Sequence, residues 1–167
     1  EFSDINKPSP AINLFFVPVL NADVLFKNLT YKVKENFPSR YYGLAITDIN
    51  NDRNFDLIVS NFEGANFYYS IKDNLYIKNH INLFINEKTI GVAACDIDGD
   101  GYEEVYFLNT DTFGGLKRSN DNLIDYDRKK YIDILSLEEN LEQRNYYAGR
   151  SVGCIDKNGS GKYDIFI

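Results

Sequence analysis

Residues 89–109 read TIGVAACDIDGDGYEEVYFLN, which is an apolar segment, a polar loop and a second apolar segment. Residues 41–61 (YYGLAITDINNDRNFDLIVSN) and residues 149–167 (GRSVGCIDKNGSGKYDIFI) repeat this plan. The loops begin at Asp48, Asp96 and Asp156, about 50 to 60 residues apart, and repeats of roughly 40–50 residues are typical of β-propeller blades. The repeat therefore predicts a fold built of similar units.

The segments on both sides of each loop predict β-strands. They are short and rich in Val, Ile, Tyr and Phe, and they are bounded by Gly, Asp and Asn. Flanking helices, as in an EF-hand, would need apolar stripes over ten or more residues, and the EF-hand acid falls at position 12 and not at position 9. Looser alternation predicts outer strands over residues 66–72, 76–85 and 130–135, and good helix formers predict a short helix over residues 135–144.

The three polar loops have the oxygen spacing of calcium sites. Calcium takes six to eight oxygens, and short acidic or amide side chains at alternate positions of a tight loop supply them. We call residues 48–56 loop one, residues 96–104 loop two and residues 156–164 loop three. The predicted ligands are Asp48, Asn50, Asp52, the Asn54 carbonyl and Asp56 in loop one; Asp96, Asp98, Asp100, the Tyr102 carbonyl and Glu104 in loop two; and Asp156, Asn158, Ser160, the Lys162 carbonyl and Asp164 in loop three.

The loops differ in their expected affinity for Ca²⁺. Loop two has the most acids and the glycines Gly99 and Gly101, which allow a positive φ. Loop one has Arg53 in the place of Gly101, and loop three has only two acids flanked by lysines. We expect the affinity order two, one, three. Asp, Asn and Gly also form ordinary turns, but three copies of one oxygen pattern favour metal sites.

Composition narrows the function classes. The net charge is −7 and the sequence pI is about 4.7, so nucleic acid and anionic membranes are unfavourable partners. No apolar run approaches the roughly 18 residues of a membrane helix. The sequence has no phosphate-binding glycine loop, nucleophile elbow or zinc-type histidine cluster, and its single histidine is His80. We therefore expect a binding protein and not an enzyme.

Two further patterns concern covalent chemistry. Cys95 and Cys154 are the only cysteines. They precede their loops by one and two residues, so they point to opposite faces of equivalent strands. Neighbouring blades present such faces to each other, which leaves open a disulfide or two buried thiols. Asn28 begins an N-glycosylation pattern, whereas Asn158, which also fits that pattern, is expected to stay unmodified as a loop ligand.

The strand, D-x-D-G-D-G-x-x-[DE], strand pattern resembles the FG-GAP and integrin-type propeller repeats. Over residues 22–167, including FEGANFYY and RKKYIDILS, the chain also resembles the cartilage acidic protein family. The resemblance implies an all-β fold: the N-terminal two and a half four-stranded blades of a secreted, calcium-loaded β-propeller of seven blades. It implies an extracellular protein partner in the matrix or at the cell surface, and no catalytic site. Arg53 departs from the family pattern.

The resulting organisation has five parts. Residues 1–23 form an N-terminal extension, 24–40 an outer ring-closing strand with its connection, 41–88 blade one, 89–147 blade two, and 148–167 the inner strands of an incomplete third blade. We expect the remaining blades to belong to a longer chain. Two other functions stay open: an integrin-type receptor ectodomain, and a carbohydrate-binding propeller that uses the aromatic side chains of Phe67, Tyr68, Tyr69, Tyr146 and Tyr147. For these aromatics, packing between blades is the favoured alternative to sugar binding.

Overall fold

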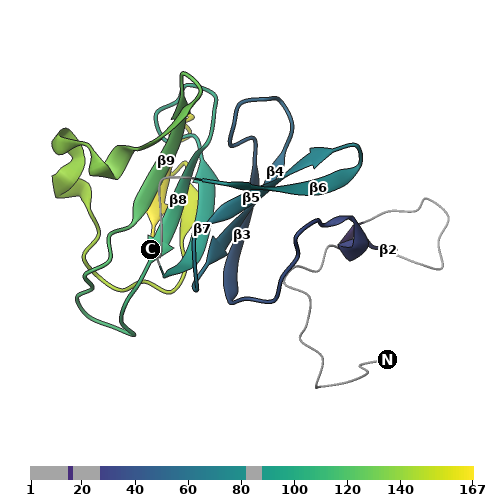
Figure 1. Ribbon diagram of the computed structural model, residues 1–167. Coiled ribbons are helices and arrows are strands. Elements are labelled where there is room, and N and C mark those ends of the chain that lie inside the picture. The colour runs from purple at the N-terminus through teal and green to yellow at the C-terminus, as the bar shows by residue number, and fades with distance from the viewer. Residues whose placement is uncertain (1–14, 17–26, 82–87) are drawn as a thin grey trace.

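A computed structural model of the chain describes residues 15–16, 27–81 and 88–167, and it is all-β apart from short 3₁₀ helices (Figure 1). Two four-stranded antiparallel sheets follow one another along the chain. The strands of the first sheet are β3 (Tyr41–Thr47), β4 (Asp56–Asn61), β5 (Phe67–Lys72) and β6 (Leu75–His80). Those of the second are β7 (Thr89–Cys95), β8 (Glu104–Asn109), β9 (Asn122–Asp127) and β10 (Lys130–Asp133). A third, two-stranded sheet contains β11 (Gly153–Ile155) and β12 (Asp164–Phe166).

The strand order matches consecutive blades of a propeller, in which each sheet is a simple meander. The all-β prediction is therefore confirmed, and the chain has the form of part of a β-propeller. The blade number of a complete ring stays a prediction.

The outer strands differ in detail from the predicted ones. β9 was not predicted, although it contains the apolar residues Leu123 and Ile124 and the aromatic residue Tyr126. β6 ends at His80, and most of the rest of the predicted segment 76–85 lies outside the described residues. The predicted helix over residues 135–144 consists of two 3₁₀ segments, Ile134–Ser136 and Glu138–Gln143. Asp133 begins the first of them by accepting a hydrogen bond from the Leu135 amide.

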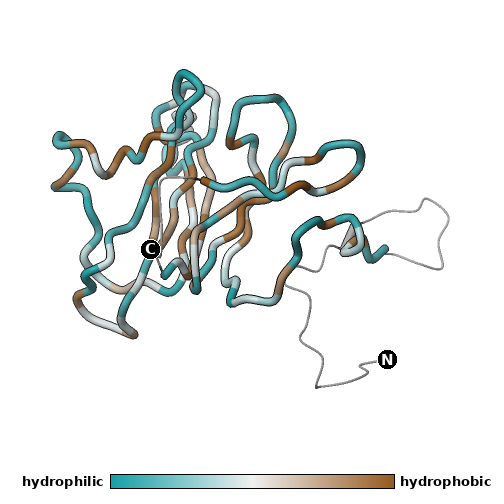
Figure 2. The backbone as a smooth tube through the Cα atoms, in the orientation of Figure 1, coloured by the Kyte–Doolittle hydropathy of each residue, from teal (hydrophilic) through white to brown (hydrophobic). Residues whose placement is uncertain are grey.

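The sheets stack face to face, and this explains why β4 and β8 are buried along almost their whole length. Figure 2 shows hydrophobic residues along the strands and hydrophilic residues on most connecting loops. One cluster fills the space between the first two sheets, and another lies between the second sheet and the third. The first contains Ile49, Ile58, Tyr68, Ile81, Val92, Val105, Phe107 and Ile124, and the second is built on Tyr106, Leu108, Leu123 and Leu135 with Val152 and Ile165 against it.

The inner strands β3 and β7 lie side by side, and Gly43 makes this approach possible. A Cβ atom on Gly43 would lie 2.9 Å from the Val92 amide nitrogen and 2.8 Å from the Ser60 hydroxyl oxygen. Any larger residue would therefore push the two sheets apart.

Buried amides join the first two sheets at the end remote from the loops. The Asn66 side chain donates to the Thr89 hydroxyl at 2.9 Å, and Thr89 donates to the Asn109 side chain at 2.5 Å. Because these buried groups are paired, they fix the sheets relative to each other without a desolvation penalty.

The segment before β3 differs from the predicted ring-closing strand. β2 (Lys27–Asn28) pairs with β1 (Phe15–Phe16), a 3₁₀ turn follows at Thr30–Lys32, and Val33 forms a parallel bridge with Tyr76. Residues 24–26 lie outside the described part. The turn replaces a continuous strand because the Val33 amide donates to the Thr30 carbonyl at 3.1 Å.

The outward face of β3 remains exposed. Tyr42, Leu44 and Ile46 alternate along the strand and are 60%, 51% and 53% exposed. Half-exposed apolar side chains in a row are unusual on a free surface. They form the face against which a neighbouring blade would pack in a ring.

Candidate metal loops

All three loops share one backbone conformation. The residues at the fourth position, Asn51, Gly99 and Gly159, have φ values of 55°, 81° and 70°. Those at the sixth position, Arg53, Gly101 and Gly161, have φ values of 69°, 91° and 86°. Arg53 therefore adopts the left-handed conformation that the sequence predicted to be strained, at a cost of roughly 1 kcal/mol.

The first aspartate organises each loop. One carboxylate oxygen accepts a hydrogen bond from the backbone amide at the sixth position: Arg53 to Asp48 at 2.5 Å, Gly101 to Asp96 at 3.0 Å and Gly161 to Asp156 at 2.8 Å. This turn directs the side chains at the first, third and fifth positions toward the inside of the loop, which is the arrangement that a calcium loop requires.

Loop two gathers three carboxylates. Oxygens of Asp96, Asp98 and Glu104 lie within 4.8 Å of one another. Glu104 opens β8 and is 1% exposed, and its carboxylate accepts a hydrogen bond from the Ile97 amide at 2.7 Å. Burial, together with the neighbouring acids, raises the pKa of Glu104 to about 7. A hard cation is the partner that would keep such a group ionised.

Asp125 is an acid near loop two that the sequence analysis missed. It lies on β9, next to Ile124, which is paired with Val105 of β8, so the same register places it across from Glu104. Burial and the Asp100 carboxylate are among the causes that raise the pKa of Asp125. The D-x-D pattern contains no signal for this residue, because β9 brings it from outside the loop. The corresponding position across from Asp56 is Ser70 on β5, which adds no charge.

Loop one contains the clearest indication of a cation site. Asp56 opens β4 and is 0% exposed, and neither carboxylate oxygen makes a hydrogen bond of normal geometry within the described residues. The Ser70 hydroxyl and the Ile49 amide lie close enough to lower its pKa, but burial outweighs them. The side-chain oxygen of Asn50 is also buried and unpartnered in the same loop. Burial is the largest cause raising the pKa of Asp56 to about 7, and the acids Asp52 and Asp48 raise it further. Buried oxygens without donors are unfavourable, and a calcium ion would satisfy them.

Loop three differs from the other two at its ninth position. The carboxylate of Asp164 forms an ion pair with the Lys157 ammonium, with 2.8 Å between nitrogen and oxygen. Its Asp156 carboxylate accepts hydrogen bonds from the amides of Asn158, Ser160 and Gly161, and these lower the pKa of Asp156. Asn158 is exposed, and its side-chain oxygen accepts from the Ser160 amide at 3.1 Å.

Loops two and three touch each other. The Tyr163 amide donates to the Asp96 carbonyl at 3.1 Å, and the aliphatic part of Lys162 lies where a side chain on Gly99 would be. No contact among the described residues tests the prediction that the Asn54, Tyr102 and Lys162 carbonyls are ligands, so it stays a prediction. The metal assignments as a whole remain predictions, which the buried acids of loops one and two support.

Cys95 and Cys154 are joined by a disulfide with a Cα–Cα distance of 6.2 Å. This is the first of the two alternatives that the sequence left open. The bond links the end of β7 to β11, so it fastens the third sheet to the second beside loops two and three.

The predicted glycosylation site and sugar-binding aromatics have different exposures. Asn28 is exposed, and its side chain accepts from the Thr30 amide at 2.9 Å. Tyr146 and Tyr147 are 50% and 66% exposed. The other three aromatics pack between strands and sheets, as the packing alternative expected, and they are not available to stack on sugars. Their exposed fractions are 1%, 8% and 1%, for Phe67, Tyr68 and Tyr69.

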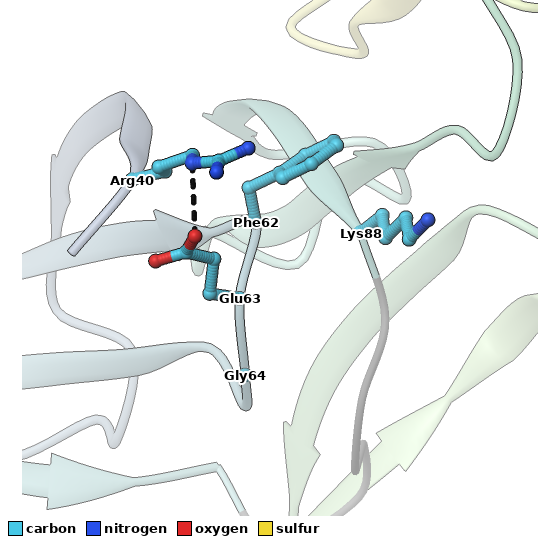
Figure 3. Close-up of a pocket in the computed structure, with 5 residues that line it drawn as sticks. All are labelled: Arg40, Phe62, Glu63, Gly64 and Lys88. Atoms are coloured by element: carbon cyan, nitrogen blue, oxygen red, sulfur yellow. Dashed lines mark ion pairs between the residues drawn. The ribbon is translucent and has the colours of Figure 1, made fainter.

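A shallow pocket lies at the opposite ends of the strands from the loops. Arg40 precedes β3, Phe62 follows β4 and Lys88 precedes β7. Figure 3 shows the Phe62 ring between the Arg40 and Lys88 side chains, with Glu63 beside Arg40. The Arg40–Glu63 ion pair measures 2.8 Å, and the Lys88 ammonium lies 5.8 Å from the centre of the Phe62 ring. The pocket joins an aromatic surface to positive charge.

Within the described residues, no helix has the length and hydrophobicity needed to cross a membrane.

Comparison with known proteins also indicates repeats of the β-propeller type. Residues 40–107 match the family described as FG-GAP-like repeat. The chain is similar to Cartilage acidic protein 1 of Xenopus tropicalis, with 41% identity over 144 residues, 75% of this chain and 22% of the relative. It is 35% identical to the human protein of that name over 179 residues, covering 92% and 27%, and 38% identical to the mouse protein over 142 residues, covering 75% and 22%. The chain thus spans about a quarter of the length of these relatives.

Proposed function

This chain is related to the cartilage acidic proteins and carries an FG-GAP-like repeat, and we propose that it is part of an extracellular, calcium-binding β-propeller. It acts by binding a protein partner in the matrix or at the cell surface, and not by catalysis. Calcium has a structural role: it fixes the β3–β4 and β7–β8 hairpins.

The observation that carries the proposal is the Asp56 carboxylate, which is 0% exposed and whose two oxygens make no hydrogen bond of normal geometry within the described residues. A buried carboxylate without a partner is unfavourable by several kcal/mol. The three gathered acids of loop two repeat the arrangement in the next sheet. A cation in each loop would compensate the charge and tie the two inner strands together.

The rest of the molecule supports an extracellular setting and a longer chain. A disulfide is typical of oxidising compartments. The exposed face of β3, with Tyr42, Leu44 and Ile46, supports the presence of further blades in the complete protein.

The pocket at the far end of the strands is a candidate contact for the partner. Lys88 beside Phe62 would suit a ligand with an acidic group and an apolar surface, and Arg40 would contribute by exchanging Glu63 for that ligand. This feature also favours the second candidate function, a propeller that binds acidic glycans. Glycan arrays distinguish the two, because a protein-binding module gives no signal that depends on Arg40 and Lys88.

Calorimetric titration with CaCl₂ tests the metal role. We expect binding with dissociation constants of about 10⁻⁴–10⁻³ M, as in other extracellular modules. A variant with Asp56→Asn and Glu104→Gln should lose most of this heat while keeping its β-sheet circular dichroism. Unchanged binding in the double variant would contradict the assignment of these residues.

A further inference from the structure

We infer that loop three binds no calcium, because the Lys157 ammonium pairs with the carboxylate that would complete its site. This inference rests on the proposed function of loops one and two. The inference is based on the residue at the second position of each loop. That position supplies none of the predicted ligands.

The backbone does not exclude calcium from loop three. Gly159 and Gly161 have the same left-handed conformation as Gly99 and Gly101 of loop two. The first aspartate accepts the same hydrogen bond from the sixth amide in both loops, 3.0 Å in loop two and 2.8 Å in loop three. The difference therefore lies in the side chains.

The second position is an isoleucine in the other two loops. Ile49 is 3% exposed in the cluster between the first two sheets, and Ile97 packs against the cluster below the third sheet. The Ile97 amide lies 2.7 Å from a carboxylate oxygen of Glu104, so position two is adjacent to position nine. A long side chain at position two can therefore reach the closing acid.

Lys157 makes that contact. Its ammonium lies 2.8 Å from a carboxylate oxygen of Asp164. Neither Asp56 nor Glu104 forms an ion pair with a basic side chain in the described part of the chain. A calcium ion in loop three would have to displace the ammonium and then remain close to it, with only Asp156 and Asp164 to offset its charge. The pair is solvent-exposed, with the Lys157 and Asp164 side chains 63% and 46% exposed. The ammonium is nevertheless tethered beside the carboxylate, whereas calcium must be drawn from solution.

Other contacts of the β11–β12 hairpin are consistent with a loop three that holds Lys157 in place of calcium. The third sheet is joined to the second by the Cys95–Cys154 disulfide and by the Tyr163 amide, which donates to the Asp96 carbonyl. The junction between these sheets is therefore closed without calcium at loop three. Calcium dependence is confined to the β3–β4 and β7–β8 hairpins.

Native mass spectrometry of the chain with its disulfide intact, in excess Ca²⁺, tests the inference. We expect two bound ions in the unmodified chain. Lys157→Ile, which gives loop three the residue of the other loops, should raise the number to three. Lys129→Gln removes one positive charge at the exposed turn between β9 and β10, outside all three loops, and should leave two. The reciprocal change Ile97→Lys should lower the number to one.

The outcomes separate the inference from the proposed function. Three ions in the unmodified chain would overturn the role of Lys157 and leave the calcium role of loops one and two standing. Two ions in both the unmodified chain and Lys157→Ile would also overturn it, because the lysine would then not be what excludes calcium. The absence of any bound ion in every variant would contradict the proposed function itself. Circular dichroism of each variant checks that the sheets are intact.

Discussion

Asp56 sits at the end of loop one with its carboxylate removed from solvent and without a hydrogen bond of normal geometry among the described residues. A single buried charge of this kind makes opposite contributions with and without a cation. It opposes folding when alone, and it stabilises the fold when an ion is bound. This sign change gives a test at one residue.

Replacing Asp56 with Asn should raise the stability of the metal-free chain and remove the stabilisation by calcium at loop one. The gain without metal is about 1–3 kcal/mol, because the amide carries no charge into the buried site. Urea unfolding with and without Ca²⁺ measures both effects. Glu104→Gln is the matched change in loop two. A variant that is less stable than the unmodified chain in both conditions would show that the Asp56 carboxylate has a different partner.

The same carboxylates predict how metal-free stability depends on pH. Burial raises the pKa of Asp56 from 3.8 and that of Glu104 from 4.5, both to about 7. Between those limits the folded chain binds more protons than the unfolded chain, so the free energy of unfolding falls as pH rises and levels off above about 7. Thermal melting of dialysed, metal-free protein from pH 5 to pH 8 measures this trend. Calcium should reverse the trend, because it binds the deprotonated carboxylates and its binding releases protons. A metal-free midpoint that rises over this range would contradict these pKa directions.

Among the elements, β5 and β9 occupy equivalent places in consecutive sheets but present different side chains to their loops. Asp125 lies across from Glu104, whereas Ser70 lies across from Asp56. The charge around each calcium loop therefore depends on β5 or β9 as well as on the sequence of the loop itself.

Exchanging these two residues should change the affinities in opposite directions. Asp125→Ser should weaken calcium at loop two by about tenfold, or about 1.4 kcal/mol, and Ser70→Asp should strengthen it at loop one. Calorimetric titrations of each single variant and of the double variant measure the changes. Equal affinities in all four proteins would mean that neither strand contributes to its loop.

Elements that are determined by residues close together in the sequence could be predicted, whereas those that depend on tertiary contacts could not. The hairpins around Asp48, Asp96 and Asp156 follow from apolar segments and turn residues a few positions apart, and the structure contains all three. β9 was missed because polar residues occupy its start. Asp121 and Asn122 are buried there, since their side chains pair with Tyr106 and Asn109. The contribution of Asp125 and the Lys157–Asp164 ion pair were also missed, since both depend on which residues the fold brings together.

At the scale of the whole molecule, the described sheets form a stack with different fastenings at each junction. The first two sheets share a buried apolar cluster and the Asn66–Thr89–Asn109 hydrogen bonds. The third is small, and the disulfide compensates for its limited buried surface.

Replacing both Cys95 and Cys154 with serine should lower the free energy of unfolding by about 2–4 kcal/mol, because the disulfide restricts the unfolded chain between distant residues. The loss should be concentrated in the third sheet. Hydrogen exchange should therefore show faster exchange at β11 and β12 and little change at β4. Equal loss of protection across all sheets would mean that the bond stabilises the whole stack at once.

The most direct test of the central claim, that calcium holds the hairpins of this β-propeller fragment, is calorimetric melting of the chain in chelator and in Ca²⁺. At about ten times the dissociation constant each occupied site adds about 1.4 kcal/mol, and about 1 kcal/mol moves the midpoint by roughly 2–4 °C in a chain of this size. With loops one and two occupied, we predict a midpoint that is higher by about 5–10 °C in Ca²⁺. An unchanged midpoint would contradict the structural role of calcium in this protein.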